Sequence, residues 1–358
     1  MDESMNLHPN PVKTIDEKIA HALGVSVSAP AIPTILAPMA GVNDVAFRQL
    51  CKEQGATLTF TEMVSTKALS FGSQKSQKLL DRAPLEDVVG IQIFGHEPKI
   101  MAQECVVIAE NMTPHVSRID INMGCPVRKI AGKGDGAALL KDPVLAAEIV
   151  QACARALAPY RIPLSIKMRM GYARDENTAP DFALRMQEAG AQALTIHGRT
   201  AAQMYTGVAN WDVIAQIKEA LSIPVVANGD VKSAQDAVDI IEHTGADAIM
   251  VARAVRGNPW LFAQMTSALA GDGILEPPSL EMRIETAKKH VSMLSQSMGN
   301  HIVYMRKHIA WYMYGIPGAA RARGAINSCI TQEDFYAVLD DIYAYAREFN
   351  SRHHEVHV

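Results

Sequence analysis

The most constraining feature of this sequence is a repeat of short β-rich runs separated by stretches of helical character. Eight runs share this pattern, at residues 34–39, 58–63, 89–95, 118–124, 164–170, 193–198, 224–229 and 248–253. Helix-like segments lie between them, for example 143–158, 211–221 and 233–243. Alternating strands and helices imply right-handed βαβ units and a parallel sheet.

Eight such units in one stretch predict an α/β fold of the closed (β/α)8 type, the TIM barrel. An open doubly wound sheet is the competitor, but it usually has fewer strands, and no G-x-G-x-x-G motif follows the first run. The strand signal ends after Leu269, and a Gly- and Pro-rich linker leads into helical text. We therefore predict an N-terminal extension at 1–30, a barrel at 31–270 and a small all-helical C-terminal domain at 279–350.

Composition narrows the class of protein. Hydrophobic residues make up 48% and charged residues 20% of the 358 residues, which is typical of a folded chain. No apolar run reaches the ~20 residues of a membrane helix, and the acidic start lacks a signal-peptide core. The five cysteines form no CxxC pair. We expect no membrane contact, no disulfide framework, no metal and a cytoplasmic location.

Charge is unevenly distributed along the chain. The net charge is −4, yet residues 286–332 contain no acidic residue. Their basic residues are Lys288, Lys289, Arg306, Lys307, Arg321 and Arg323. This segment therefore carries +6, which leaves −10 on the remainder. The asymmetry favours a polyanion partner for the helical domain, and a merely solvated basic face is the alternative.

Active sites of such barrels lie at the C-terminal ends of the strands. Lys167 and Arg169 are two residues apart in the fifth run, so they share one face of the strand. Two cations in a barrel lumen need an anionic partner, because an unpaired buried charge is very costly. A bound anion is favoured over an ion pair with Glu62 or Asp120.

Gln92 lies within the third predicted strand, and further residues lie at or near the ends of later ones. These are Asn122, His197, Asn228, Gly229, Asp230, Ala252 and Arg253. The loops after strands seven and eight are the usual phosphate site of these barrels, where glycine allows close approach and arginine can contact phosphate oxygens. Cys125 follows the fourth run, and its thiol is protonated at neutral pH, so it is a candidate general acid.

Several ordered motifs resemble the tRNA-dihydrouridine synthase family, most closely its bacterial B-type subgroup. The most specific is DINMGCPVRK at 120–129. The others are LAPMAG at 36–41, GIQIFG at 90–95, IKMRMG at 166–171, TIHGRT at 195–200, VANGD at 226–230, and the tail pair RKH at 306–308 and WY at 311–312. The resemblance covers roughly residues 30–345.

The resemblance implies an FMN-dependent enzyme that reduces a uridine of tRNA to 5,6-dihydrouridine, with NADPH (or NADH) as the electron donor. It further implies that hydride passes from FMN N5 to C6 while Cys125 donates a proton to C5. The implied flavin-binding residues are Pro38, Met39, Ala40, Gln92, Lys167, His197, Asn228, Gly229, Asp230, Ala252 and Arg253. The implied substrate-binding residues are Asn122, Arg169, Arg306 and Lys307. A monomer is expected, although the sequence determines neither oligomeric state nor target uridine.

Three alternatives stay open. One is an FMN barrel that acts on a free pyrimidine, like dihydroorotate dehydrogenase, which would not need the basic tail. Another is a Schiff-base aldolase that uses Lys167. The third is a non-catalytic RNA-binding barrel, which would lack the flavin absorption band.

Overall fold

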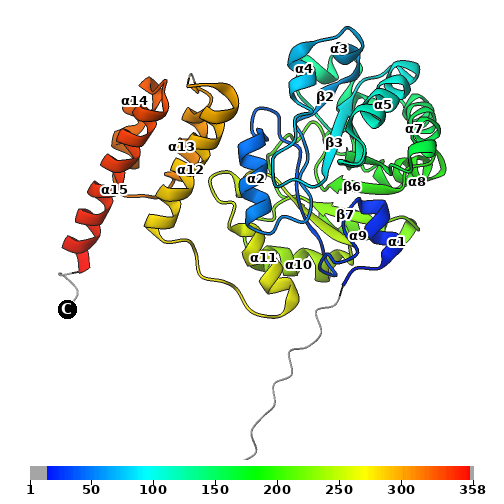
Figure 1. The fold of residues 1–358 in the computed structure, drawn as a ribbon. Helices are drawn as coiled ribbons and strands as arrows, with labels where there is room; N and C mark the ends of the chain where they lie inside the picture. Colours follow the sequence, from blue (N-terminus) through cyan, green and yellow to red (C-terminus); the bar gives the residue numbers. More distant parts are fainter. Residues whose placement is uncertain (1–13, 301, 355–358) are drawn as a thin grey trace, which may run out of the picture.

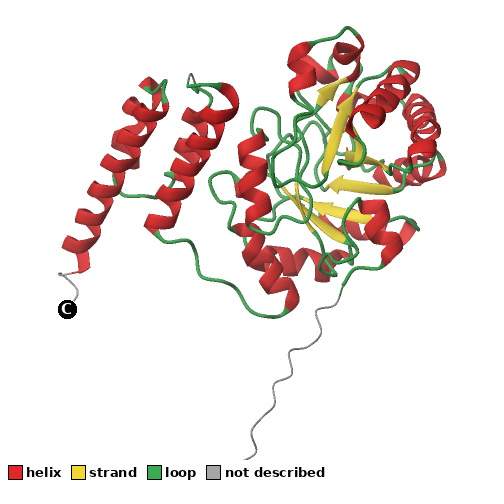
Figure 2. Ribbon diagram, in the orientation of Figure 1, coloured by secondary structure: helices red, strands yellow, loops and turns green. Residues whose placement is uncertain are grey.

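A computed structural model describes residues 14–300 and 302–354 of the chain. Eight parallel strands form the centre, helices surround them, and the C-terminal helices lie to one side (Figures 1 and 2). The strands are β1 (Thr34–Leu36), β2 (Val64–Ser65), β3 (Val89–Phe94), β4 (Val116–Met123), β5 (Leu164–Arg169), β6 (Ala193–His197), β7 (Val225–Asn228) and β8 (Ala248–Val251). The predicted α/β barrel fold is confirmed.

The sheet closes because its first and last strands are neighbours. The strand order is β1-β8-β7-β6-β5-β4-β3-β2, and every pair is parallel. Between β1 and β3, Leu58 bridges to Ile35 and Phe60 bridges to Gly90. The predicted second strand at 58–63 is therefore only a pair of single bridges. Residues 57–61 make two backbone hydrogen bonds to each neighbour, and the regular pairing of β2 begins later.

The helices that surround the strands follow them in chain order. They are α2 (Val45–Glu53), α3 (Thr66–Ser70), α4 (Gln74–Lys78), α5 (Pro98–Met112), α6 (Arg128–Ala131), α7 (Pro143–Leu157), α8 (Ala179–Glu188), α9 (Trp211–Ala220), α10 (Ala234–Thr244) and α11 (Leu261–Ala270), with 3₁₀ turns at Gly136–Lys141, Ala158–Tyr160 and Arg253–Val255. Capping side chains mark the N-terminal ends of several of these helices. Asp44 caps α2 by accepting from the Phe47 amide, and Ser233 and Asp236 form a capping box at α10.

Strand side chains divide between two apolar layers. Ile166 and Met168 lie in the layer between strands and helices. Lys167 and Arg169 alternate with them, so they project into the barrel. Near the opposite end, Phe60 and Met250 fill the lumen against α1 (Glu17–Leu23), which closes the bottom. The lumen is therefore filled with apolar side chains at the end closed by α1, and it is polar at the C-terminal ends of the strands.

The C-terminal helices have a core of their own. They are α12 (Leu280–Met298), α13 (Met305–Tyr312), α14 (Ala319–Ser328) and α15 (Gln332–His354). Ala46 of α2 belongs to this core, and Lys289 of α12 pairs with Glu53 of α2 at 2.6 Å. In Figure 1 these helices accordingly stand beside α2. Among the described residues, no helix is long and apolar enough to cross a bilayer.

Gly90 packs directly against the Phe60 ring in the lumen, so we expect that position not to tolerate a side chain. A methyl group there would overlap the Phe60 ring. Gly90→Ala should therefore lower the free energy of unfolding by about 1–3 kcal/mol, as overpacking does. Urea unfolding measures this, with Gly324→Ala as the control. Position 324 lies in α14 with open space around it, so alanine there should stabilise by roughly 0.5–1 kcal/mol. Equal stability of Gly90→Ala and the parent chain would contradict the packing argument.

Candidate active site at the barrel mouth

The mouth of the barrel is the opening at the C-terminal ends of its strands. There, a lysine and an asparagine link three strand ends by hydrogen bonds. The Lys167 Nζ of β5 donates to Asn228 Oδ1 of β7 at 2.8 Å, and Asn228 Nδ2 donates to the Met250 carbonyl of β8 at 2.7 Å. Asn228 is buried, and Lys167 is half-buried. The partner of Lys167 is thus an uncharged amide, so its positive charge remains uncompensated by a direct ion pair within residues 14–300 and 302–354.

A second chain of hydrogen bonds leads from the barrel interior to Cys125. Gln92 donates to Asp120 at 2.8 Å and accepts from Asn122 at 2.8 Å. The Oδ1 of Asn122 accepts from the Gly124 amide at 3.1 Å and the Cys125 amide at 2.9 Å. Asn122 therefore shapes the turn that presents Cys125. Its burial leaves 8% of its surface exposed.

Cys125 itself is half-buried, unlike the other four cysteines. Burial raises the pKa of its thiol, and the Val127 amide, Arg169 and Lys167 oppose that rise. The thiol is therefore protonated at neutral pH, as a proton donor must be. The two cations act on it from β5, so thiol and lysine share the mouth.

Arg169 is used to hold loops in place. Its Nε donates to the Gly124 carbonyl at 2.9 Å, and its Nη1 donates to the carbonyls of Thr200 and Met204, each at 2.8 Å. It is 4% exposed. One guanidinium thus joins the Cys125 turn to the loop after β6, which gives it a positioning role beside any contact with a substrate.

Arg199 and Asp230 form an ion pair that holds a second loop. The sequence pattern indicated Asp230 but did not predict this pairing. Arg199 is 2% exposed, and its Nη2 lies 2.7 Å from Asp230 Oδ2. The same carboxylate accepts from the Ala209 amide at 2.8 Å. Burial raises the pKa of Asp230, but the Ala209 amide and then Arg199 outweigh it and hold that pKa below its usual range. Asp230 therefore fixes the 199–209 loop, which bears on its predicted role as a flavin ligand.

Four cations surround His197 at the end of β6. Burial, then Lys167, Arg169, Arg199 and Arg253, hold the pKa of His197 well below its ordinary value. The imidazole is neutral at pH 7 for this reason. Asp230 pairs with Arg199 at 2.7 Å and with Arg253 only at 4.0 Å, and the buried Asp120 acts on Lys167 from within the barrel. The mouth carries excess positive charge, which favours an anionic ligand.

The rest of the predicted phosphate loops lies at the same rim. Gly229 has a positive φ of 128°, and a Cβ there would lie 2.8 Å from Ala209 Cβ. Arg253 is exposed, and its guanidinium lies 4.3 Å from the centre of the Tyr205 ring. Ala252, just before it, is half-buried. An exposed arginine at the end of β8 is free to meet an anion that enters from solvent.

The loop after β1 brings the C-terminal domain to the mouth. Pro38 and Met39 are half-buried there, and Ala40 is exposed. Next in the loop, the Gly41 amide donates to Glu62 at 2.6 Å. Glu62 also accepts from the Tyr304 hydroxyl at 3.2 Å. The rim and the helical domain therefore share one carboxylate.

The two predicted RNA-binding cations of α13 are half-buried. Arg306 donates through Nε to the Cys329 carbonyl at 2.8 Å, and Lys307 stacks on the Tyr304 ring at 3.2 Å. Neither has a short ion pair among the described residues, whereas Lys288 and Lys289 are bound at 2.6 Å to Asp340 and Glu53. The cations of the segment without a short ion pair are thus Lys307, which lies over Tyr304 near the rim, Arg306 before it in α13, and the exposed Arg321 and Arg323 of α14.

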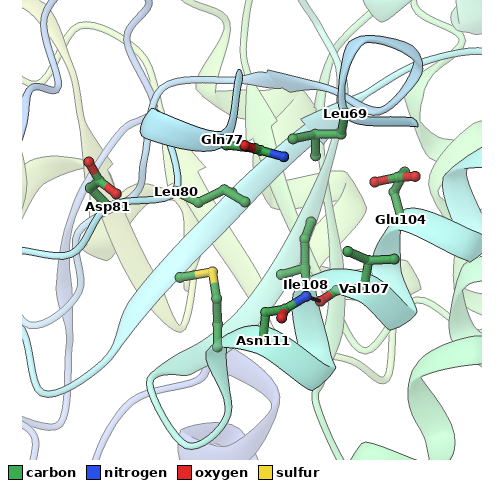
Figure 3. A pocket seen from close by; sticks show the side chains of 9 residues that line it. Leu69, Gln77, Leu80, Asp81, Glu104, Val107, Ile108 and Asn111 are labelled. Carbon is green, nitrogen blue, oxygen red and sulfur yellow. Dashed lines mark hydrogen bonds between the residues drawn. The ribbon is translucent and has the colours of Figure 1, made fainter. Parts of the chain in front are cut away.

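A hollow on the outer wall is not part of this site. Its volume is about 400 Å³, and it is lined from α3, α4 and α5, with Leu69, Leu80, Val107 and Ile108 as its apolar side (Figure 3). Its charged groups are Asp81 and Glu104, and burial raises the pKa of Glu104. An acidic, aliphatic hollow on the helix layer does not suit an anionic ligand.

Fold and site together define a barrel enzyme with a cationic mouth and a protonated thiol. The family model "Dihydrouridine synthase (Dus)" matches residues 35–350. tRNA-dihydrouridine synthase B of Xanthomonas campestris pv. campestris is 39% identical over 323 residues, with 90% of this chain and 95% of the relative covered. The protein of the same name from Pseudomonas aeruginosa is 38% identical over 315 residues, covering 85% of this chain and 92% of the relative.

A third relative has a less specific name. The "probable tRNA-dihydrouridine synthase" of Rickettsia conorii is 38% identical over 297 residues, covering 82% of this chain and 88% of the relative. Among solved structures, histamine dehydrogenase from Rhizobium sp. 4-9 aligns with a TM-score of 0.49 at 14% identity, over 74% of this chain and 49% of that chain. The chain belongs to the dihydrouridine synthase family.

Proposed function

We propose that this enzyme reduces a uridine of tRNA to 5,6-dihydrouridine at the barrel mouth, with FMN as its cofactor. Family membership supports the reaction class, and it disfavours both the Schiff-base aldolase and the non-catalytic barrel. The observation that carries the proposal is the set of four cations around His197, next to a protonated Cys125.

The residues of the mouth fit an anionic flavin. Lys167, Arg253 and the neutral His197 lie at the ends of β5, β8 and β6, and they have excess positive charge to offer a phosphate or an electron-rich ring. When bound, FMN supplies the hydride that passes from N5 to C6 of the uracil. Lys167 would lie near N1 and O2 of the ring, Gln92 at its edge, and Asn228, Gly229 and Arg253 by the ribityl phosphate. Pro38, Met39 and Ala40 would line the ring, while Asp230 and Ala252 support the phosphate loop.

Cys125 would complete the reduction by donating its proton to C5. Its raised pKa keeps the proton on sulfur until the carbon becomes basic. Asn122 orients the turn through the Cys125 amide, and Arg169 fixes the same turn through the Gly124 carbonyl. Both residues would therefore act on the uracil through the position of the thiol as well as by direct contact.

The tRNA would approach across the rim that the helical domain shares with the barrel. Lys307 lies over the Tyr304 ring, whose hydroxyl donates to Glu62 at the rim, and Arg306 precedes it in α13. Their positive charge suits the RNA backbone. A stacked uridine must leave its stack to reach a barrel mouth. NADPH (or NADH) as electron donor, a cytoplasmic location and a monomeric state complete the proposal.

The direct test compares substrates. Purified enzyme, NADPH and unmodified tRNA should give a product in which one uridine has gained two hydrogen atoms, measured by mass spectrometry of nuclease digests. Free uridine and free orotate should react far more slowly, because they lack contacts to the helical domain. Equal turnover of free pyrimidine and tRNA would favour the dihydroorotate-dehydrogenase-like alternative.

Cys125→Ala should keep flavin and tRNA binding and lose most turnover. General acid catalysis contributes roughly 10²–10⁴-fold, so kcat should fall within that range. Single-turnover oxidation of the reduced enzyme by tRNA measures the step directly. Cys153→Ala is the matched control, because Cys153 is a buried thiol within α7. Unchanged single-turnover rates in Cys125→Ala would remove the thiol from the reaction.

Lys167 should give FMN binding a pH dependence. Burial and then Arg169 lower its pKa to about 8, so the ammonium is charged at pH 7 and neutral well above pH 8. A bound anion favours the charged form, so affinity of the apoprotein for FMN should fall as the pH rises above 8, by at most about tenfold per unit. Fluorescence quenching of FMN measures it.

Two variants separate this effect from general alkaline damage. Lys167→Met should bind FMN more weakly at pH 7 and lose the slope above pH 8. Lys218→Met is the control, because Lys218 pairs with Asp247 at 2.7 Å away from the mouth and should leave the slope intact. A slope that survives in Lys167→Met would show that another group titrates.

Arg306→Ala combined with Lys307→Ala should weaken tRNA binding and flatten its salt dependence. Each lost phosphate contact removes roughly 0.7–0.9 from the slope of log K against log salt. The control pair is Lys288→Ala with Lys289→Ala, which removes the same charge from residues already paired with Asp340 and Glu53. Fluorescence anisotropy at several salt concentrations distinguishes them. An identical slope in both double variants would place the RNA elsewhere.

A further inference from the structure

A buried cluster outside the mouth joins the barrel to the helical domain. It consists of Asp44, the N-cap of α2, with His290 of α12 and His308 of α13. Both histidine side chains are fully buried, and the Asp44 side chain is 9% exposed. One possible ligand atom from each residue lies within 4.8 Å of the others. Three segments as far apart as 246 residues thus meet at one point.

The candidate ligand atoms lie close enough together for one ion to reach all three residues. His290 Nε2 lies 3.2 Å from Asp44 Oδ1, and His308 Nε2 lies 3.2 Å from Asp44 Oδ2. With bonds of about 2.0–2.1 Å, two ligands of a tetrahedral zinc ion are roughly 3.3 Å apart. Each histidine is therefore at about this spacing from one oxygen of Asp44, and a small adjustment would bring both nitrogens and the carboxylate onto one ion.

Hydrogen bonding alone leaves part of the cluster unsatisfied. Although His308 Nε2 and Asp44 Oδ2 are 3.2 Å apart, they are not aligned as donor and acceptor, and neither atom has another hydrogen-bond partner among the described residues. The other ring nitrogen of His308 also lacks a partner there. Orphaned buried polar atoms are costly, and a cation that both atoms face would remove that cost.

The surroundings also resemble those of a metal ligand. The second ring nitrogen of His290 lies 3.3 Å from the Tyr312 hydroxyl, a contact of the kind that orients a metal-binding imidazole. The Phe47 ring packs against both imidazoles, with centroids 6.0 and 5.7 Å away, and shields the site from solvent. Two imidazoles and one carboxylate are a donor set that suits zinc better than magnesium or calcium.

We propose that Asp44, His290 and His308 bind one zinc ion at the junction of the barrel and the helical domain. The protein supplies three ligands, and a water molecule would take the fourth position of the tetrahedron. The ion would fasten α12 and α13 to the start of α2, immediately after the loop of Met39 and Ala40. The ion would link the two parts of the chain, and it is separate from the reaction at the mouth.

The test measures zinc in the purified, untagged, flavin-loaded enzyme by plasma mass spectrometry. Because the sequence ends with His353, His354 and His357, all three are replaced by asparagine in the parent chain to remove an adventitious site. The parent should retain about one zinc per chain after desalting, lose it to a strong chelator, and regain it from zinc chloride but not from magnesium chloride. A parent that neither retains nor takes up zinc overturns the proposal.

Asp44→Asn and His308→Gln identify the ligands. Asparagine is as good an N-cap as aspartate, so the first variant preserves the start of α2 while removing the carboxylate. Both variants should lose more than the roughly 10–100-fold in zinc affinity that an outer-shell change costs. His243→Gln is the matched control, since it breaks an exposed histidine–aspartate pair of 2.7 Å with Asp212 and should keep its zinc. Full zinc content in both cluster variants overturns the assignment.

A measurement without substitutions guards against variants that do not fold. X-ray absorption at the zinc edge of the parent should show two imidazoles, the rest oxygen, and no sulfur. Sulfur in the shell would place the ion at a cysteine and overturn the proposal.

Discussion

The structure of the mouth follows from positive charge that the protein does not neutralise. Lys167, Arg169, Arg199 and Arg253 all act on His197, whereas Asp230 pairs with Arg199 and the buried Asp120 acts on Lys167. Bringing several cations together in a partly buried site costs several kcal/mol per ion unless each is compensated. The chain meets part of this cost with carbonyl and amide oxygens. The remainder is the free energy that an anionic ligand recovers on binding, which is why such a mouth has high affinity for one.

The four cations divide into two kinds by what they contact. Arg169 and Arg199 are nearly inaccessible and donate to backbone carbonyls, so they fix the loops that follow β4 and β6. Lys167 donates to one amide, that of Asn228, and Arg253 lies over the Tyr205 ring. Both retain contact with solvent. Arginine suits the first task because its planar fork reaches several oxygens at once. Lysine suits the second, because burial can bring its pKa down to the range where a bound anion controls its charge.

The fold could be predicted from the sequence because strands and helices leave periodic patterns of residues. Less of the site could be predicted, because side-chain contacts between loops leave no such pattern. Parity along the fifth run oriented Lys167 and Arg169, as the packing of Ile166 and Met168 bears out. The same reasoning could not tell that Arg169 would meet the carbonyls of two different loops. Nor could it predict the pair of Arg199 and Asp230, since that depends on how the 199–209 loop folds back. The second run failed as a strand because its residues pair briefly with one neighbour and then the other.

The helical domain is more than an appendage, because two carboxylates of the barrel depend on it. Glu62 accepts from Gly41 in the loop after β1 and from Tyr304 ahead of α13. Asp44 ends that same loop, caps α2, and faces His290 and His308. The loop that lines the mouth is therefore linked to the helical domain at two points, at Gly41 through Glu62 and at its end through Asp44 itself. A displacement of α13 must move those groups or break their contacts, so RNA bound by that domain, as proposed, would be mechanically coupled to a ligand at the rim. The spacing between a target nucleoside and the mouth would then be set by this junction rather than by the linker at 271–279.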